Sequence, residues 1–174
     1  MRAISAQAPA DARADLSALA TDGLFSGIIG AFTVAIFFLI LDIVDGRPLF
    51  TPSLLGSVVF LGANAESVNT VSLPMAAVYT GLHFGAFFCI GVVAAYMVDR
   101  FEHNPPVGAV LILLAVCFEA AFFAFTIALA PGVVGVLGAW AVGVANLLAA
   151  ATMAVYFRLS HPHALEQLDR IWEE

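Results

Sequence analysis

Four long apolar runs, separated by short polar breaks, dominate the pattern of this chain. They cover residues 24–44, 73–98, 107–130 and 133–157. A helix needs about 20 consecutive apolar residues to cross the hydrocarbon core of a bilayer, and each run is long enough. The pattern therefore predicts an all-α fold, an antiparallel four-helix transmembrane bundle.

The polar breaks indicate where the helices end. Asp45–Pro48 ends the first run, because Gly and Pro interrupt helices. Thr21–Gly23 is expected to end a short amphipathic helix that precedes this run. The pattern divides the chain into a polar N-terminal segment, a transmembrane domain and an amphipathic C-terminal tail, at residues 1–22, 23–158 and 159–174.

A shorter apolar segment between the first two runs predicts one further helix. It follows Phe50 and is too short to cross a membrane. Thr51 suits the N-cap, Pro52 suits the first helical position and Gly62 suits the C-terminal end. We expect a short interfacial helix in the first outer loop, with a re-entrant hairpin as the alternative.

Composition supports the membrane assignment and excludes several classes of function. Hydrophobic residues make up 62% of the 174 residues and charged residues 11%, whereas soluble domains are roughly half apolar and a quarter charged. The formal net charge is −7 and every basic residue is an arginine, so no polybasic surface for nucleic acid is predicted. The sequence holds no phosphate-binding glycine loop and no plausible Ser/His/Asp set, so we expect no enzymatic activity and no catalytic residue.

The distribution of arginine predicts the orientation. With four spans, both termini and the Asp99–Pro106 loop lie on one side, and only Arg47 lies on the other. Cytoplasmic segments carry the excess of positive charge, so both termini are predicted to be cytoplasmic. Residues 1–22 lack the apolar region of a secretory signal, and the first span is expected to be an uncleaved anchor. The arginines on the cytoplasmic side are Arg2, Arg13, Arg100, Arg158 and Arg170.

Each apolar run contains one polar side chain near its middle. At a rise of about 1.5 Å per residue, these side chains lie at similar depth, and we expect them to form a buried polar layer. Hydrogen bonding between helices would explain the layer, and so would a functional Glu–His pair that carries protons or binds a ligand. The layer comprises Thr33, His83, Glu119 and Asn146, with Tyr79 one turn before His83.

A third interpretation makes His83 the axial ligand of a haem or chlorophyll-type group, although no cofactor is predicted in the leading interpretation. Cys89 and Cys117 lie at similar depth. They project about 240° and 200° around their helices from His83 and Glu119, at about 100° per residue. The thiols therefore do not converge with the Glu–His pair, and no metal site is predicted.

Two further groups of residues suggest contacts with partners. Asp42, Asp45 and Arg47 form a candidate docking site in the outer loop, although Asp42 also suits the end of a helix or a pair with Arg47. Small residues let membrane helices approach closely, and the last run carries two ladders of them. One ladder is Gly135, Ala139 and Gly143, and the other is Ala141, Ala145 and Ala149; further pairs are Gly23/Gly27, Ser26/Gly30 and Gly81/Gly85.

The stretches FLILDIVDGRPLFTPSLLGSVVFLG (residues 38–62), YTGLHFGAF (79–87) and ANLLAAATMAVYF (145–157) resemble segments of small four-span bacterial membrane proteins that form an uncharacterised group. The resemblance implies a bacterial cytoplasmic (inner) membrane protein and no particular activity. We expect a non-catalytic accessory or scaffold subunit of a larger membrane complex, respiratory or photosynthetic. Its expected partners are membrane lipids and other membrane subunits or further copies of the chain. The alternatives are a small transporter or proton-conducting protein and a cofactor-binding protein.

Overall fold

The computed structural model of the protein describes residues 8–110, 112–114, 116–117, 120 and 131–161. Helices dominate the fold, and the described residues include no strand. Three helices are long and apolar enough to cross a membrane. They are α1 (Ala8–Val44, from Leu16 onward), α3 (Leu73–His103) and α6 (Ala139–Ser160). The expected all-helical fold is confirmed, and these three helices have the length and composition that membrane spans require.

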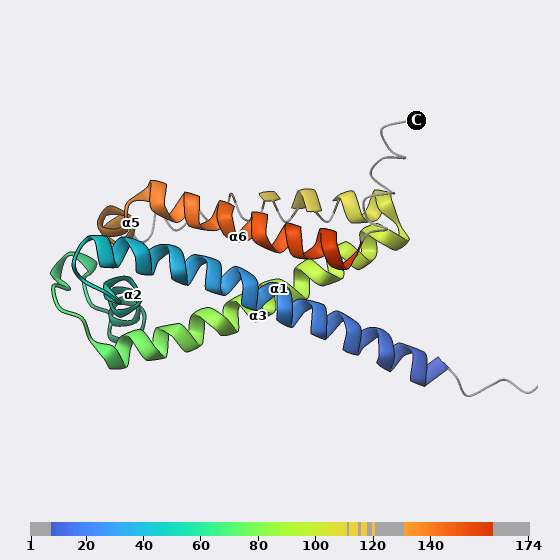
Figure 1. The fold of residues 1–174 in the computed structure, drawn as a ribbon, viewed down its shortest axis with the longest axis horizontal. Helices are drawn as coiled ribbons and strands as arrows, with labels where there is room; N and C mark the ends of the chain where they lie inside the picture. The colour runs from blue at the N-terminus through green and yellow to red at the C-terminus, as the bar shows by residue number, and fades with distance from the viewer. Residues whose placement is uncertain (1–7, 111, 115, 118–119, 121–130, 162–174) are drawn as a thin grey trace, which may run out of the picture.

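Glycines bring α1 and α3 into close contact where the two helices cross (Figure 1). A Cβ atom on Gly23 would lie 2.6 Å from the Cα of Val92, and one on Gly27 would overlap the carbonyl oxygen of Phe87. On α3, a Cβ on Gly91 would overlap the carbonyl of Gly23. Backbones approach this closely only where side chains are absent, so these glycines fix the crossing point.

The third spanning helix, α6, packs along α1 (Figure 1). Its buried residues recur at helical spacing and are mostly small or apolar: Ala141, Ala145, Ala149, Met153 and Phe157. The side chain of Met153 reaches Gly30 of α1, where a Cβ would lie 2.8 Å from its sulfur. The alanine ladder of the last run therefore lies on the inward face of α6.

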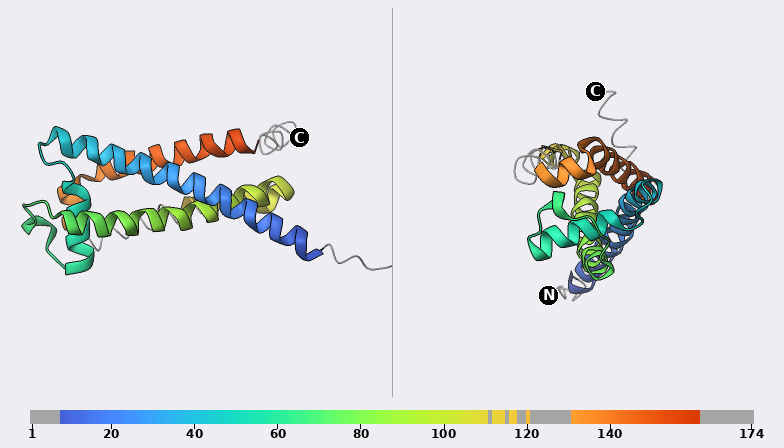
Figure 2. Two further views of the ribbon diagram at one scale, coloured as in Figure 1. Left: turned by 60° about the horizontal axis from the view of Figure 1, so that its bottom comes forward. Right: turned by 90° about the vertical axis from the view of Figure 1, so that its left-hand side faces the viewer.

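Short helices cover one end of the spanning helices. α2 (Phe50–Leu61) stands across the separated ends of α1 and α3, as Figure 2 shows, and is followed by η1 (Ala65–Ser67). Together with α5 (Pro131–Leu137) they bury a small apolar cluster. The cluster comprises Phe50, Leu54 and Ala65, with Val58, Val68, Val133 and Leu137 packed at its edge.

Polar contacts and a tight approach hold α2 against α3. The Ser53 hydroxyl accepts a hydrogen bond of 2.7 Å from the amide of Ser72, next to the start of α3. A Cβ on Gly56 would overlap the carbonyl of Met75. α2 is therefore fixed to α3, and it holds α3 away from α1 at this end of the protein.

Two expected helix ends differ in the structure. The expected end at Thr21–Gly23 is wrong, because α1 continues through it. The Thr21 hydroxyl donates to the carbonyl of Ser17 within the helix, and Gly23 is needed for the approach of α3. α2 begins one residue before Thr51, with Leu49 as its N-cap, whereas Gly62 ends it as expected with a φ of 64°.

The last apolar run is divided at Gly138, which has a φ of 81° and separates α5 from α6. Residues other than glycine rarely adopt this backbone conformation, so the glycine permits the break. The candidate span is consequently α6 and not the whole run from 133 to 157. In the run from 107 to 130 the described residues are helical, and the remainder, including Glu119, lies outside the described residues.

Candidate functional site

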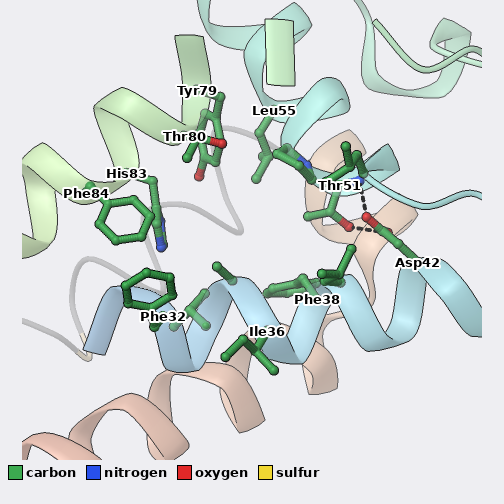
Figure 3. A pocket seen from close by; sticks show the side chains of 15 residues that line it. Phe32, Ile36, Phe38, Asp42, Thr51, Leu55, Tyr79, Thr80, His83 and Phe84 are labelled. Carbon is green, nitrogen blue, oxygen red and sulfur yellow. Dashed lines mark hydrogen bonds between the residues drawn. The ribbon is translucent and has the colours of Figure 1, made fainter. Parts of the chain in front are cut away.

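A pocket of about 320 Å³ lies between α1, α2 and α3, where the three helices separate (Figure 3). The glycine crossing draws α1 and α3 together on one side of it, and α2 forms the opposite wall. Helical spacing explains the lining, because residues three or four apart share a face. The lining includes Phe32, Ala35, Phe38 and Asp42 of α1, Thr51 and Leu55 of α2, and Tyr79, Thr80, His83 and Phe84 of α3.

Aromatic side chains close the pocket toward the crossing point. The rings of Phe32 and Phe84 meet edge to face, with their centroids 5.0 Å apart. The His83 ring lies 4.8 Å from that of Phe87 and 5.8 Å from that of Phe84. Phe84 meets both Phe32 and His83 edge to face, which is a favoured arrangement of aromatic rings, so these side chains pack together on this side of the pocket.

His83 lies in an apolar run, and a contact with the backbone of α1 explains why a polar ring is accommodated there. Its Nε2 lies 3.1 Å from the carbonyl oxygen of Ala31 on α1. A carbonyl oxygen only accepts hydrogen bonds, so Nε2–H is the donor, and in a neutral ring Nδ1 is left as an acceptor. His83 therefore joins α3 to α1 while its ring lines the pocket.

Two polar atoms on the α3 wall are available to a ligand. Within the described part of the chain, His83 makes its hydrogen bond through Nε2, and the Tyr79 hydroxyl has no hydrogen bond. Every fully buried polar side-chain atom there has a partner. His83 Nδ1 and Tyr79 Oη are therefore not fully buried, and their rings stack with centroids 6.2 Å apart.

The carboxylate of Asp42, which also lines the pocket, already has hydrogen-bond partners. Asp42 is buried, and its two oxygens accept hydrogen bonds from the amide and the hydroxyl of Thr51, at 2.8 and 2.7 Å. The Arg47 guanidinium instead lies 3.9 Å above the ring of Phe50. Asp45 is exposed. Of the three outer-loop residues, Asp42 thus joins α1 to α2, and the side chains of Asp45 and Arg47 remain on the surface.

Thr33, one member of the expected polar layer, joins α1 to α6. The Thr33 hydroxyl lies 3.0 Å from that of Thr152 on α6, and it also donates to the carbonyl of Ile29. Asn146 is half-buried on α6. Sequence reasoning missed Thr152, although it lies seven and three residues after Ala145 and Ala149 and so continues their buried face. Since Glu119 is outside the described residues, its pairing with His83 stays a prediction.

The expected packing ladder of Gly135, Ala139 and Gly143 does not lie on one helix, because the break at Gly138 falls within it. All three residues are exposed. No described atom would lie within 4 Å of a Cβ on Gly135 or Gly143, nor on Gly81 or Gly85 of α3. These small residues therefore present open surface on the described part of the protein.

A polar cluster lies at the opposite end of the protein from α2. His161, directly after α6, places Nε2 3.2 Å from Oδ2 of Asp22 and Nδ1 3.4 Å from the carboxylate of Glu102. The Tyr156 hydroxyl donates to Oδ1 of Asp22 at 2.9 Å. This cluster joins α1, α3 and α6. The side chain of His161 is only 21% exposed.

The described residues include no group of three His, Cys, Asp or Glu side chains arranged to hold a metal ion. Cys89 and Cys117 are free thiols. Comparison of the chain with protein-family models, with curated proteins and with solved structures finds no match. The function is therefore argued from the geometry of the pocket.

Proposed function

We propose that this is a non-catalytic integral membrane protein that binds a lipid-soluble molecule in the pocket between α1, α2 and α3. The observation that carries the proposal is the pocket itself, which has a volume of about 320 Å³ and a mostly apolar lining with few polar groups. Ligand pockets typically have volumes of about 300–1,000 Å³ and this kind of lining. A cavity of about 150 Å³ already holds benzene, so a ligand of one or two rings fits here.

In this proposal the chain crosses the bacterial inner membrane four times, as an antiparallel bundle with both termini in the cytoplasm. Contacts along α1 and α3 run in opposite order, since Gly23 approaches Val92 whereas Ala31 meets His83. The cluster at His161 places the ends of α3 and α6 beside Asp22 of α1. A fourth span within residues 107–130 is consistent with both observations.

The polar groups of the pocket favour binding over chemistry. The Asp42 carboxylate is occupied by Thr51, and His83 uses one nitrogen to hold α1. In the described part of the pocket, His83 and Tyr79 instead offer single hydrogen bonds to a ligand.

Filling the pocket tests the proposal. Ala35 lines the pocket, whereas Ala86 is exposed on α3 outside it, so Ala35→Trp and Ala86→Trp form a matched pair. Each protein is purified in mild detergent from its native membranes, and the retained small molecules are extracted and quantified by mass spectrometry. We expect a molecule that the parent and Ala86→Trp retain and that Ala35→Trp loses. Equal retention by both variants, or nothing above empty micelles, would contradict the proposal.

The expected role as an accessory subunit of a larger membrane complex is a second proposal. It is supported by the exposed face of α3 at Gly81 and Gly85, where another helix can approach the backbone closely. Native gel electrophoresis of gently solubilised membranes tests it. The proposal expects a large species that Gly85→Leu disrupts, and it fails if the parent migrates as a monomer with nothing attached.

A further inference from the structure

We propose that the ligand of this pocket is an aromatic alcohol, a lipid-soluble ring that carries a hydroxyl group, and that this hydroxyl donates a hydrogen bond to Nδ1 of His83. The inference rests on the proposed function and specifies the chemical class of the ligand. It follows from the hydrogen bonds that His83 and Tyr79, on the α3 side of the pocket, make and do not make within the described residues.

The contact of His83 with the backbone of α1 fixes the orientation of its ring. Because Nε2–H donates to the carbonyl of Ala31, the neutral ring presents Nδ1 as an acceptor. A polar atom in apolar surroundings is costly to leave without a partner. A ligand that supplies a donor is therefore favoured over a hydrocarbon chain, which supplies none.

The hydroxyl group of Tyr79 belongs to the residue one helical turn before His83. Its ring stacks on that of His83, so both polar groups serve the same wall of the pocket. A ligand hydroxyl donates one hydrogen bond and accepts others, which suits an acceptor nitrogen beside a phenol donor. A ligand carbonyl or ether, by contrast, offers Nδ1 no proton.

Two other polar side chains of the lining, by contrast, already have hydrogen-bond partners. Both carboxylate oxygens of Asp42 accept from Thr51. The Thr80 hydroxyl donates to the carbonyl of Ala76 within α3. Among the described residues, the wall formed by Tyr79 and His83 is consequently where the polar end of a ligand finds atoms without a hydrogen-bond partner.

The aromatic side chains that line the pocket favour a ligand with an aromatic ring. Phe32, Phe38 and Phe84 line the pocket, and Phe32 and Phe84 already meet edge to face (Figure 3). Flat rings gain from offset or edge contacts with such side chains beyond the burial of their area. A ring seated among these phenylalanines places its substituent near the α3 wall, where His83 lies.

Three probes of similar shape separate the contributions of the ring and the hydroxyl. They are naphthalene, 2-methoxynaphthalene, which has an oxygen but no donor, and 2-naphthol. Binding to the full chain in lipid nanodiscs is measured by equilibrium dialysis, with partition into empty nanodiscs subtracted. A hydrogen bond to Nδ1 predicts that 2-naphthol binds roughly two- to tenfold more tightly than the other two.

His83→Phe keeps an aromatic ring and removes the acceptor, and Tyr79→Phe removes only a hydroxyl. We expect both variants to bind naphthalene like the parent, His83→Phe to lose the preference for 2-naphthol, and Tyr79→Phe to reduce it. If the parent binds naphthalene and 2-naphthol equally, or 2-methoxynaphthalene as tightly as 2-naphthol, the inference is overturned while the proposed function stands. If the parent binds none of the probes above empty nanodiscs, both fail.

Discussion

The carboxylate of Asp42, three residues from the start of the turn after α1, holds the amide and the hydroxyl of Thr51 in the first turn of α2. The N-cap residue of α2 is Leu49, which has a φ of 66° and no capping side chain. Asp42 thus provides from another helix the hydrogen bond that an N-cap residue normally provides. It fixes α2 relative to α1 and with it the outer wall of the pocket.

Replacing Asp42 tests this link. Asp42→Ala leaves two polar atoms of buried Thr51 without their acceptor, which costs about 1–3 kcal/mol for each buried group. We expect a clearly lower midpoint of thermal unfolding in detergent. Asp45→Ala, at an exposed position nearby, is the control and should leave the midpoint unchanged. The same midpoint in both variants would refute the role of Asp42.

The crossing of α1 and α3 predicts that alanine is destabilising at one glycine and tolerated at another. Gly27→Ala places a methyl group against the carbonyl of Phe87, and overpacking of this kind typically costs about 1–3 kcal/mol. Gly85→Ala adds the same methyl group to the open face of α3. Thermal unfolding should show a loss of stability for Gly27→Ala and no loss for Gly85→Ala, and equal losses would argue against the crossing described here.

The two threonines between α1 and α6 should be energetically coupled. The hydroxyls of Thr33 and Thr152 lie 3.0 Å apart, and such contacts between membrane helices average about 0.6 kcal/mol. A double-mutant cycle with Thr33→Val and Thr152→Val measures the coupling by unfolding in mixed micelles. The single substitutions should cost more in sum than the double variant. Additive effects would show that the two hydroxyls do not interact.

The cluster at His161 should stabilise the end of the protein opposite α2. His161→Ala removes contacts to both Asp22 and Glu102, whereas His103→Ala removes contacts to Asp99, one turn earlier in α3. We expect faster amide hydrogen exchange around Asp22 of α1 and at the C-terminal end of α6 in His161→Ala, because their mutual contacts loosen. Exchange in His103→Ala should match the parent, and the reverse order of effects would contradict this assignment.

The sequence predicted helices that are long and apolar enough to cross a bilayer. It did not predict which residues of these helices contact a neighbouring helix. Run length alone indicates helices that could cross a membrane, and three helices have the required length and composition. The sequence does not indicate which side of a helix faces a partner. Gly81 and Gly85 looked equivalent to Gly23 and Gly27, yet the close approach on α3 occurs at Gly91.

The candidate site was predicted only in part, for a related reason. His83 and Tyr79 stand out as polar residues in an apolar run. The partner of His83 is a backbone carbonyl, which every residue possesses and no sequence pattern displays. Asp42 and Thr51 were each noted, but their contact depends on the path of the turn between α1 and α2. The pocket itself arises from helices that separate, and only the three-dimensional arrangement shows it.

The central claim is that the space between α1, α2 and α3 is an accessible pocket, and two neighbouring leucines of α2 test it most directly. Leu55 lines the pocket, whereas Leu54 is 0% exposed in the apolar cluster behind it. In a background with Cys89→Ser and Cys117→Ser, the rate of modification by N-ethylmaleimide is measured for Leu55→Cys and for Leu54→Cys. Because thiol reactivity requires access, we predict a rate about tenfold higher or more at position 55, and slower modification there when 2-naphthol is present. Equal rates at the two positions would show that the space is closed and would contradict the account.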